Sequence, residues 1–280
     1  MTKSRYDVVV AAGRTMLHVP FALGGIAVFH SIPSAMLGGS ELDLDACLLA
    51  KIFSGQITDW SDSEIRANNP GLTASGKIKV VRRKNGSSST TGFTEYLNKK
   101  CPASWAVSNG CGSTGCATGS TIIWPTDFAI AEGSSGMSAY LQANDFAIGY
   151  IDAGHGHDAG LSEVALLNRD GKYLTTRQAD IGAAAVQALA PPSVLPENAT
   201  ADFSAVNLYD LPGVDTWPSA RTWRPREGAG GRGRALSRCT PLFGRALPAP
   251  AAAWTGLSAC AHMLPRRLPA RAYASSAQSR

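Results

Sequence analysis

Apolar residues along this chain occur in two alternating patterns, and each pattern predicts a different element. Short runs rich in β-branched and apolar residues predict strands. Segments in which apolar residues recur every three or four positions predict amphipathic helices. The predicted strands are residues 7–12, 19–30, 78–81, a strand that ends at 122–125, 147–151 and 164–168, and the predicted helices are 42–53, 61–68, one that runs on from Phe93, 134–144 and 177–190. This alternation indicates an α/β architecture with a mainly parallel or mixed sheet.

One junction between a strand and a helix carries the strongest candidate chemistry. The predicted strand 78–81 leads to Arg83 and then to the hydroxyl-rich segment 87–91, which opens a helix. A helix N-terminus leaves its first backbone N–H groups unpaired and carries a partial positive charge. Small hydroxyl residues let the backbone approach a ligand closely, and an arginine adds a planar fork of donors. The junction therefore predicts a cradle for an oxyanion.

A plainer interpretation of the same segment stays open. Serine and threonine favour turns and helix N-caps, so residues 87–91 can form a turn and a cap without binding a ligand. Arg83 lies four residues before Ser87 and favours the anion site, because a plain turn does not need an arginine.

Residues 83–90, together with 93–97, resemble the phosphate-binding loop and helix of the phosphate-binding proteins of ABC importers. The resemblance implies an α/β fold of the periplasmic-binding-protein type (type II). It also implies that the anion is held by Arg83, Ser87, Ser88 and Ser89, with support from Asn85, Gly86 and Thr90. The chain departs from the family pattern twice. Ser88 stands where the family has a glycine, and the neutral Asn85 replaces an aspartate that orients the arginine.

The resemblance covers about residues 19–218 and divides the chain into three parts. Residues 1–28 correspond to a partial first lobe and a hinge segment, and residues 29–218 to one largely complete lobe. The other lobe is partial or missing, because its early glycine-serine loop and aspartate motif have no counterpart here. Residues 219–280, rich in Arg, Ala, Pro and Gly without any period, are expected to be a disordered tail.

Two glycines, Gly24 and Gly25, interrupt the apolar strand 19–30. Glycine inside a strand predicts a bend or a close backbone approach. The resemblance implies that this segment crosses between two lobes. An ordinary core strand with a bulge is the alternative.

Charge is divided unevenly between these parts. The formal net charge is +5, but residues 219–280 contain eleven arginines and one acid, so residues 1–218 carry a net charge of −5. An arginine-rich tail attracts nucleic acids or anionic membranes without sequence specificity. The alternatives are that the tail is an interaction or targeting segment, or that it is an artefact of the gene model and is not coding sequence. No feature of the acidic part predicts specific nucleic-acid recognition.

Cysteine and histidine positions predict no metal site. The spacings of Cys101, Cys111 and Cys116 do not match a zinc site. A disulfide between two of these three is expected in an oxidising compartment, and three reduced cysteines are the alternative. Cys47 is expected to be a buried free thiol. The histidines of segment 154–158 lie among glycines, which predicts a solvated loop. No metal and no cofactor are therefore expected.

The sequence leaves the compartment open. No apolar run reaches the roughly 18 residues that a transmembrane helix needs. The first residues lack the apolar core of a signal peptide, whereas the resemblance implies an extracellular or periplasmic location.

The resemblance implies binding of inorganic phosphate for uptake or scavenging, with an ABC transporter permease as the partner, and not catalysis. We expect the missing lobe to weaken that binding. One alternative is a phosphatase of the same fold, although no nucleophile stands beside a base in the sequence. The other is an interaction protein that keeps the lobe only for its fold.

Overall fold

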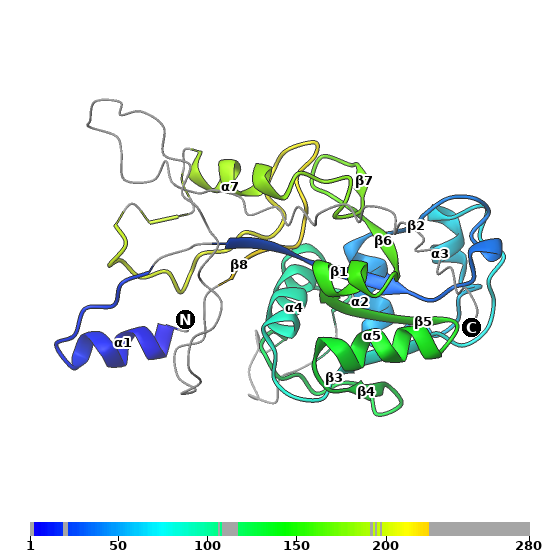
Figure 1. Ribbon diagram of the computed structural model, residues 1–280, viewed down its shortest axis with the longest axis horizontal. Helices are drawn as coiled ribbons and strands as arrows, with labels where there is room; N and C mark the ends of the chain where they lie inside the picture. The colour runs from blue at the N-terminus through cyan, green and yellow to red at the C-terminus, as the bar shows by residue number, and fades with distance from the viewer. Residues whose placement is uncertain are drawn as a thin grey trace, which may run out of the picture.

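The computed structural model describes residues 3–18, 22–105, 107, 117–190, 193, 195–196 and 198–223, and it contains an eight-stranded mixed sheet with helices around it (Figure 1). The strands are β1 (Ala22–His30), β2 (Leu42–Leu44), β3 (Lys79–Arg83), β4 (Ala129–Ala131), β5 (Ala147–Asp152), β6 (Ser162–Leu167), β7 (Tyr173–Leu174) and β8 (Ala220–Trp223). The helices are α1 (Lys3–Ala11), the 3₁₀ turn η1 (Ser34–Met36), α2 (Ala46–Phe53), α3 (Ser63–Asn68), α4 (Ser88–Lys100), α5 (Gly133–Ala143), α6 (Ala153–Asp158) and α7 (Ile181–Leu189). None of the described helices is both long and apolar enough to span a lipid bilayer.

The predicted α/β architecture with a mixed sheet is confirmed. The strands follow the order β2-β6-β1-β5-β3-β4, with β7 beside β6 and β8 beside β1. Strand β1 runs antiparallel to β5 and β6, whereas β3 runs parallel to β4 and β5. The central place of β1 follows from its sequence, since residues 26–29 are apolar throughout and at most 2% exposed. A strand covered on both faces needs such a continuous apolar run.

Helices cover both faces of the sheet, and the alternation of side chains along β5 shows which helix lies where. Tyr150 stacks on Phe93 of α4, with ring centroids 4.5 Å apart. Its neighbour Gly149 faces the other way, because a Cβ there would lie 3.0 Å from Cε of Met137 in α5. Successive strand residues point to opposite faces. Helix α4 therefore lies on one face of the sheet and α5 on the other.

The helix predicted for residues 42–53 begins later than expected. Leu42–Leu44 forms β2 beside β6, and Asp45 caps the helix. The Asp45 carboxylate accepts the backbone N–H groups of Cys47 at 2.7 Å and Leu48 at 2.8 Å. The apolar-polar-apolar order of residues 42–44 suits a strand as well as a helix, and the neighbouring strand decides the outcome. Trp60, which follows α2, is fully buried in the core.

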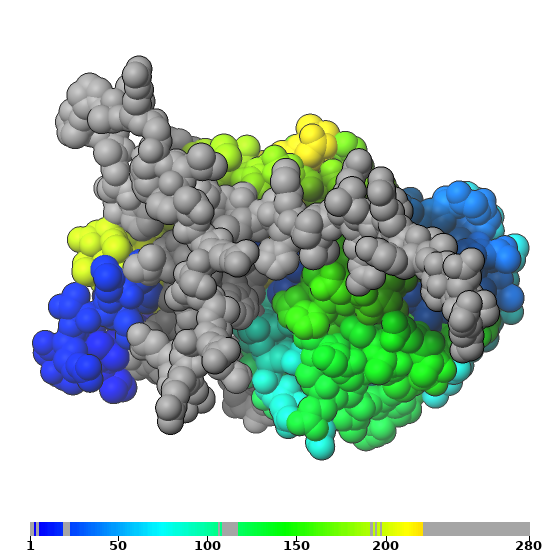
Figure 2. Space-filling view, viewed as in Figure 1, coloured from blue at the N-terminus to red at the C-terminus, as the bar shows by residue number. Residues whose placement is uncertain are grey.

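The strand predicted for residues 7–12 is wrong, because residues 7–11 belong to α1. This helix projects from one end of the molecule (Figures 1 and 2). Val8 is 70% exposed, and no strand pairs with this segment within the described residues. Lys3 and Asp7 form an ion pair one helical turn apart. A β-branched run forms a strand only beside another strand, and here hydrogen bonds and side-chain pairs within the helix satisfy the segment instead.

Two further elements differ from the prediction. The segment 154–158 is not a loop but part of α6, and a Cβ on Gly156 would lie 2.1 Å from the Phe29 ring. Glycine there reflects close packing and not flexibility. Residues 122–125 lie outside β1 to β8, and the strand in this region is β4. Ile122 and Trp124 are buried and Ile123 is exposed, so this segment packs on the core outside the eight strands.

A disulfide joins Cys47 of α2 to Cys101 at the end of α4, with the Cα atoms 5.2 Å apart. The prediction of a free thiol at Cys47 is therefore wrong. Cys47 and Cys101 are 54 positions apart, so the spacing of cysteines close in sequence does not reveal this pair. Cys111 and Cys116 lie outside the described residues. The bond ties the far end of α4 to its neighbouring helix.

A disordered tail was predicted to begin at Ser219, but the first residues of that segment are ordered. Ala220–Trp223 forms β8, which pairs antiparallel with the first residues of β1, from Ala22 to Gly25. A Cβ on Gly25 would lie 3.0 Å from Cγ2 of Thr176 and 3.2 Å from Nε1 of Trp217. Side chains therefore pack closely on Gly25, whereas nothing lies within 4 Å of a Cβ built on Gly24. Residues 224–280 lie outside the described part of the chain.

Candidate anion-binding site

The predicted junction is a strand, a turn and a helix, as the pattern indicated. Strand β3 ends at Arg83, and Ser87 is the N-cap of α4 with an extended backbone. The Ser87 hydroxyl accepts the backbone N–H of Thr90 at 3.0 Å. Ser87 is only 8% exposed, and its own N–H donates to the carbonyl of Ser120 at 3.1 Å. The cap interpretation thus holds for Ser87, whose polar groups are engaged within the protein.

A buried hydroxyl chain fixes the first turn of α4 to the sheet. The Thr90 hydroxyl lies 2.8 Å from the Ser87 hydroxyl and 2.8 Å from the Tyr150 hydroxyl. Burial raises the pKa of Tyr150 to about 12, although its hydrogen bonds to Thr90 and to the Arg83 backbone act in the opposite direction. Tyr150 therefore stays protonated and holds the end of β3 and the start of α4 together.

Ser88 and Ser89, the first two residues of α4, follow the cap. Ser88 is exposed, and Ser89 is 2% exposed. Within the described residues, no group accepts the backbone N–H of Ser89. An N–H in the first turn of a helix has no carbonyl four residues earlier in the helix to bond. This amide and the positive end of the dipole of α4 make the turn a suitable place for an anion.

Arg83 lies between the beginnings of two helices. The register pairs Arg83 of β3 with Ala131 of β4, so these parallel strands end side by side and α4 and α5 begin at the same edge. The guanidinium Nη1 of Arg83 donates to the Ser134 hydroxyl of α5 at 3.3 Å. Ligands in α/β proteins commonly bind beyond the carboxyl ends of strands. The arginine is thus placed where its remaining donors can meet an anion.

Asn85 does not occupy the supporting position that the resemblance implies. Its Nδ2 lies 3.5 Å from Oε1 of Glu132, and both residues are exposed. Among the described residues, the side chain that contacts the Arg83 guanidinium is that of Ser134. Ser134 was not among the predicted site residues, because it lies 51 positions from Arg83 in the sequence. Its only signal was a Gly-Ser-Ser-Gly stretch at the start of a predicted helix.

Gly86 is placed by close packing of the turn. A Cβ on Gly86 would lie 3.1 Å from the Thr121 hydroxyl and 3.3 Å from the Ser120 hydroxyl. The turn therefore packs closely against Ser120 and Thr121, and the Ser120 carbonyl accepts the N–H of Ser87. Glycine at this position lets the backbone follow that path.

A carboxylate that sequence analysis also missed stands beside Ser89. The Ser89 hydroxyl donates toward both oxygens of Asp152, each at 3.4 Å. Asp152 ends β5, and its side chain shares a face with that of Tyr150, two residues earlier. In the described part of the chain neither Asp152 nor Arg83 forms an ion pair. The site therefore contains one guanidinium and one carboxylate that do not neutralise each other.

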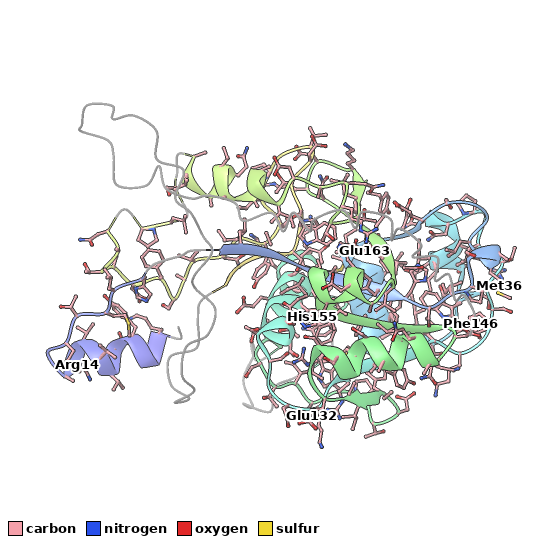
Figure 3. The ribbon with its side chains drawn as sticks, viewed as in Figure 1. Arg14, Met36, Glu132, Phe146, His155 and Glu163 are labelled. Carbon is pink, nitrogen blue, oxygen red and sulfur yellow. A yellow bond between two sulfur atoms is a disulfide. The ribbon has the colours of Figure 1, made fainter. Side chains whose placement is uncertain are left out.

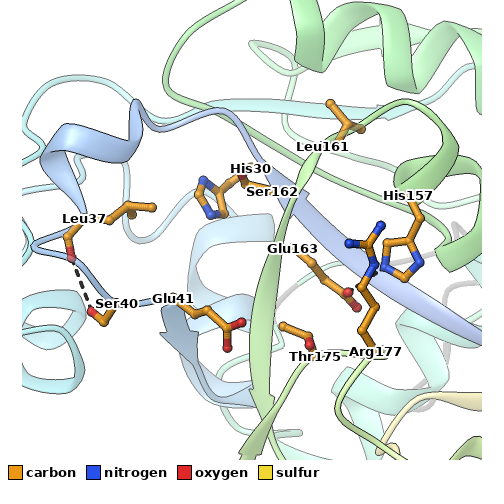
Figure 4. Close-up of a pocket in the computed structure, with 10 residues that line it drawn as sticks. All are labelled: His30, Leu37, Ser40, Glu41, His157, Leu161, Ser162, Glu163, Thr175 and Arg177. Carbon is orange, nitrogen blue, oxygen red and sulfur yellow. Dashed lines mark hydrogen bonds and ion pairs between the residues drawn. The ribbon is translucent and has the colours of Figure 1, made fainter. Parts of the chain in front are cut away.

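A second polar cluster lies around a cavity of about 270 Å³ beside β6 and α6 (Figure 4). His157 lies 2.8 Å from Glu163 and 3.2 Å from the Thr176 hydroxyl. Burial lowers the pKa of His30, which lines the same cavity, to about 4. None of the residues predicted to hold the anion lines this cavity. Glu132, beside Asn85, and Glu163 lie well apart in Figure 3.

No metal centre is found in the described part of the chain, where no three His, Cys, Asp or Glu side chains converge. His157 does not lie in a solvated loop, as predicted, but in α6 against Glu163.

Comparison with known proteins gives a consistent result. A family model described as a PBP superfamily domain matches residues 1–205. A phosphate-binding protein PstS of Xylella fastidiosa is 30% identical over 204 residues, which cover 72% of this chain and 51% of that protein. A protein of the same name from Methanocaldococcus jannaschii is 29% identical over 227 residues, which cover 77% and 54%. The chain spans about half the length of these relatives.

Solved structures agree on the fold. A phosphate-binding protein from Stenotrophomonas maltophilia superposes with a TM-score of 0.55 at 22% identity, covering 79% of this chain and 60% of that chain. A periplasmic phosphate-binding protein bound with phosphate superposes with a TM-score of 0.52 at 23% identity, covering 79% and 61%. The predicted fold of the periplasmic-binding-protein type is confirmed by this likeness.

Proposed function

The chain belongs to the PBP superfamily domain family, and from this membership we propose that it binds inorganic phosphate at the N-terminus of α4. Arg83, Ser88 and Ser89 contact the anion in this proposal, and Ser87 contributes through the turn that it caps. The observation that carries the proposal is the Ser89 backbone N–H, which has no protein partner within the described residues. Relatives that are named phosphate-binding proteins support phosphate as the anion.

The proposed biological role is solute binding for phosphate uptake or scavenging, with an ABC transporter permease as the partner. This chain by itself is proposed to bind weakly, because it spans about half the length of its relatives. Each charge-assisted hydrogen bond contributes roughly 1.5–3 kcal/mol. Three such bonds from a second lobe would contribute about 4–9 kcal/mol, and about 1.4 kcal/mol changes affinity tenfold. A micromolar site would thus become millimolar or weaker.

Isothermal titration with inorganic phosphate tests the proposal. Arg83→Ala removes the guanidinium and should abolish the binding heat seen with the wild type. Lys84→Ala is the matched control, because it removes an equal charge from an exposed neighbouring residue that pairs with Glu132 at 3.6 Å. Equal heats for the wild type and Arg83→Ala would contradict the proposal.

Binding, and not turnover, is the proposed activity. An assay with p-nitrophenyl phosphate separates the two, because a binding protein leaves this ester intact. Turnover by the wild type that disappears in Arg83→Ala would instead support a phosphatase.

A further inference from the structure

An exposed turn between α7 and β8 carries a triplet that can accept an N-linked glycan. Residues 198–200 read Asn-Ala-Thr, and the general signal for such a glycan is Asn-X-Ser/Thr in which X is not proline. The same signal occurs at residues 85–87 and nowhere else in the sequence. Because so short a signal often arises by chance, the structure around each asparagine must decide whether it can be used.

The turn at Asn198 has a geometry that suits a glycan acceptor. Asn198 is exposed, and its Oδ1 accepts the Thr200 backbone N–H at 2.9 Å and the Thr200 hydroxyl at 2.8 Å. This Asx turn holds the asparagine side chain beside the hydroxyl that completes the signal. Within the described residues, Nδ2 of Asn198, the atom to which a sugar would be joined, has no hydrogen-bond partner.

The backbone of the turn is anchored through groups that a glycan leaves intact. The Ala199 carbonyl accepts the N–H of His18 at 2.8 Å, and the Thr200 carbonyl accepts the Tyr6 hydroxyl at 3.1 Å. Because a glycan is added before folding is complete, the finished fold must accommodate it at the acceptor. A sugar on the exposed Asn198 Nδ2 breaks neither of these bonds, so the fold accommodates it here.

The triplet at Asn85 differs on these points. Nδ2 of Asn85 lies 3.5 Å from Oε1 of Glu132, so a sugar there would displace this contact. The hydroxyl of Ser87, which completes this triplet, is buried and bonds to Thr90. A glycan on Asn85 would also stand beside the start of α4. The structure therefore favours Asn198 over Asn85 as the acceptor.

The disulfide supplies an independent indication of the compartment. Cys47 is joined to Cys101, and disulfides form and persist in oxidising compartments such as the lumen of the endoplasmic reticulum, whereas they are rare in the cytosol. N-linked glycans are added in that same lumen. The covalent bond and the exposed triplet thus indicate one and the same route for the chain.

We propose that Asn198 is an N-glycosylation site whose co-substrate is an oligosaccharide joined through a diphosphate to a lipid. In the transfer a bond forms between Nδ2 of Asn198 and C1 of the first sugar. The bond from that C1 to the diphosphate breaks, and the amide loses one proton as the lipid diphosphate departs. The acceptor turn is held to α1 at Tyr6, and α1 lies apart from α4 in Figure 1, so the glycan stands away from the anion site.

The test produces the full chain through the secretory route of cultured eukaryotic cells and measures its mass before and after treatment with peptide:N-glycosidase. The wild type should lose the mass of a glycan, and the treatment should leave aspartate at position 198, which peptide mapping by mass spectrometry identifies. Asn198→Gln should lack this glycan. Asn85→Gln is the matched control, because it removes the other triplet and should retain the glycan at Asn198.

Two changes at Thr200 separate the complete signal from the asparagine alone. Thr200→Ala keeps Asn198 but removes the hydroxyl, and the glycan should be lost. Thr200→Ser keeps a hydroxyl, and the glycan should be retained. Masses are read on denatured protein from cells and medium together, so a variant that folds poorly still gives a result.

Two results would overturn the inference. One is a wild type that carries the disulfide between Cys47 and Cys101 but no glycan at Asn198. The other is a glycan that persists in Asn198→Gln and disappears in Asn85→Gln, since the acceptor would then be Asn85. Neither result bears on phosphate binding, which the titration of Arg83→Ala tests separately.

Discussion

The two polar clusters of this molecule differ in how far their members satisfy one another. Around the cavity beside β6, Glu163 accepts the backbone N–H of Thr176 at 2.8 Å with one oxygen and meets His157 at 2.8 Å with the other. At the start of α4, the Ser89 N–H has no acceptor within the described residues, and the contacts of Arg83 and Ser89 are longer, at 3.3 Å and 3.4 Å.

Whether the polar groups of a cluster bond to one another separates a structural cluster from a binding site better than the presence of a cavity does. The cavity is lined by more titratable side chains, and the two at its centre, His157 and Glu163, bond to each other. A buried or half-buried group without a partner costs stability, and a ligand can remove that cost. We therefore expect changes at the cavity to affect stability, and changes at the α4 turn to affect anion binding.

Glu163→Ala should have the largest effect and should act on stability alone. The side chain of Glu163 is 5% exposed, and its loss removes the acceptor of the Thr176 N–H and leaves His157 with only the Thr176 hydroxyl. The free energy of unfolding should fall by about 3 kcal/mol, as measured by urea denaturation. Glu41→Ala, an exposed carboxylate on the same cavity, should change it by less than about 0.5 kcal/mol. If folded Glu163→Ala binds phosphate with an altered affinity, the cavity cluster affects binding as well as stability, and the two clusters do not differ as proposed.

The pH dependence of stability gives the second test of the cavity. His30 has its pKa lowered by burial to about 4, whereas the unfolded chain has the ordinary value of about 6.5. The unfolded state therefore binds a proton first, and stability falls as the pH falls from about 6.5 to about 4, by up to about 3 kcal/mol. Urea unfolding at several pH values measures this loss.

His30→Asn is the control for that experiment, because its amide oxygen can replace Nδ1 as the acceptor of the Ile32 N–H, now at 3.1 Å. The variant should lose this part of the pH dependence. An unchanged slope would assign the acid sensitivity to other groups.

Thr90→Val tests whether the hydroxyl chain at the anion site contributes both to stability and to phosphate binding. The change removes the hydroxyl that links Ser87 to Tyr150 and leaves the buried Tyr150 hydroxyl with one partner fewer. We expect a loss of about 1–3 kcal/mol in stability and weaker phosphate binding, because the turn is held less firmly. Combining it with Tyr150→Phe should cost less than the sum of the two single changes. Strict additivity would contradict a shared hydroxyl chain.

Ser134→Ala should have the smallest effect and should act on binding. It removes the hydroxyl that meets the Arg83 guanidinium at 3.3 Å. One modest hydrogen bond is worth about 1 kcal/mol, so phosphate should bind several-fold less tightly, by titration calorimetry. Ser135→Ala, the exposed next residue, is the control. Equal affinities in the two variants would mean that Arg83 does not depend on Ser134.

Local patterns predicted those parts of the fold that local chemistry controls. The run at residues 26–29 predicted a buried strand, and the hydroxyl-rich segment after β3 predicted the start of α4. The same patterns were wrong where two structures satisfy them equally well. The valines after Asp7 suit a strand only if another strand lies beside them, and the alternation from Leu42 to Leu44 suits a helix until β6 pairs with it.

By itself the sequence determined the alternation of strands and helices that indicates the kind of fold, and the turn at which an oxyanion is proposed to bind, because these depend on residues close together along the chain. The tertiary structure alone decided which residues stand around that turn. Ser134 reaches Arg83 across 51 positions, Asp152 reaches Ser89 across 63, and Cys47 bonds to Cys101 across 54. Strand order and the packing of helices on the sheet bring such residues together, and neither is written in any single local pattern.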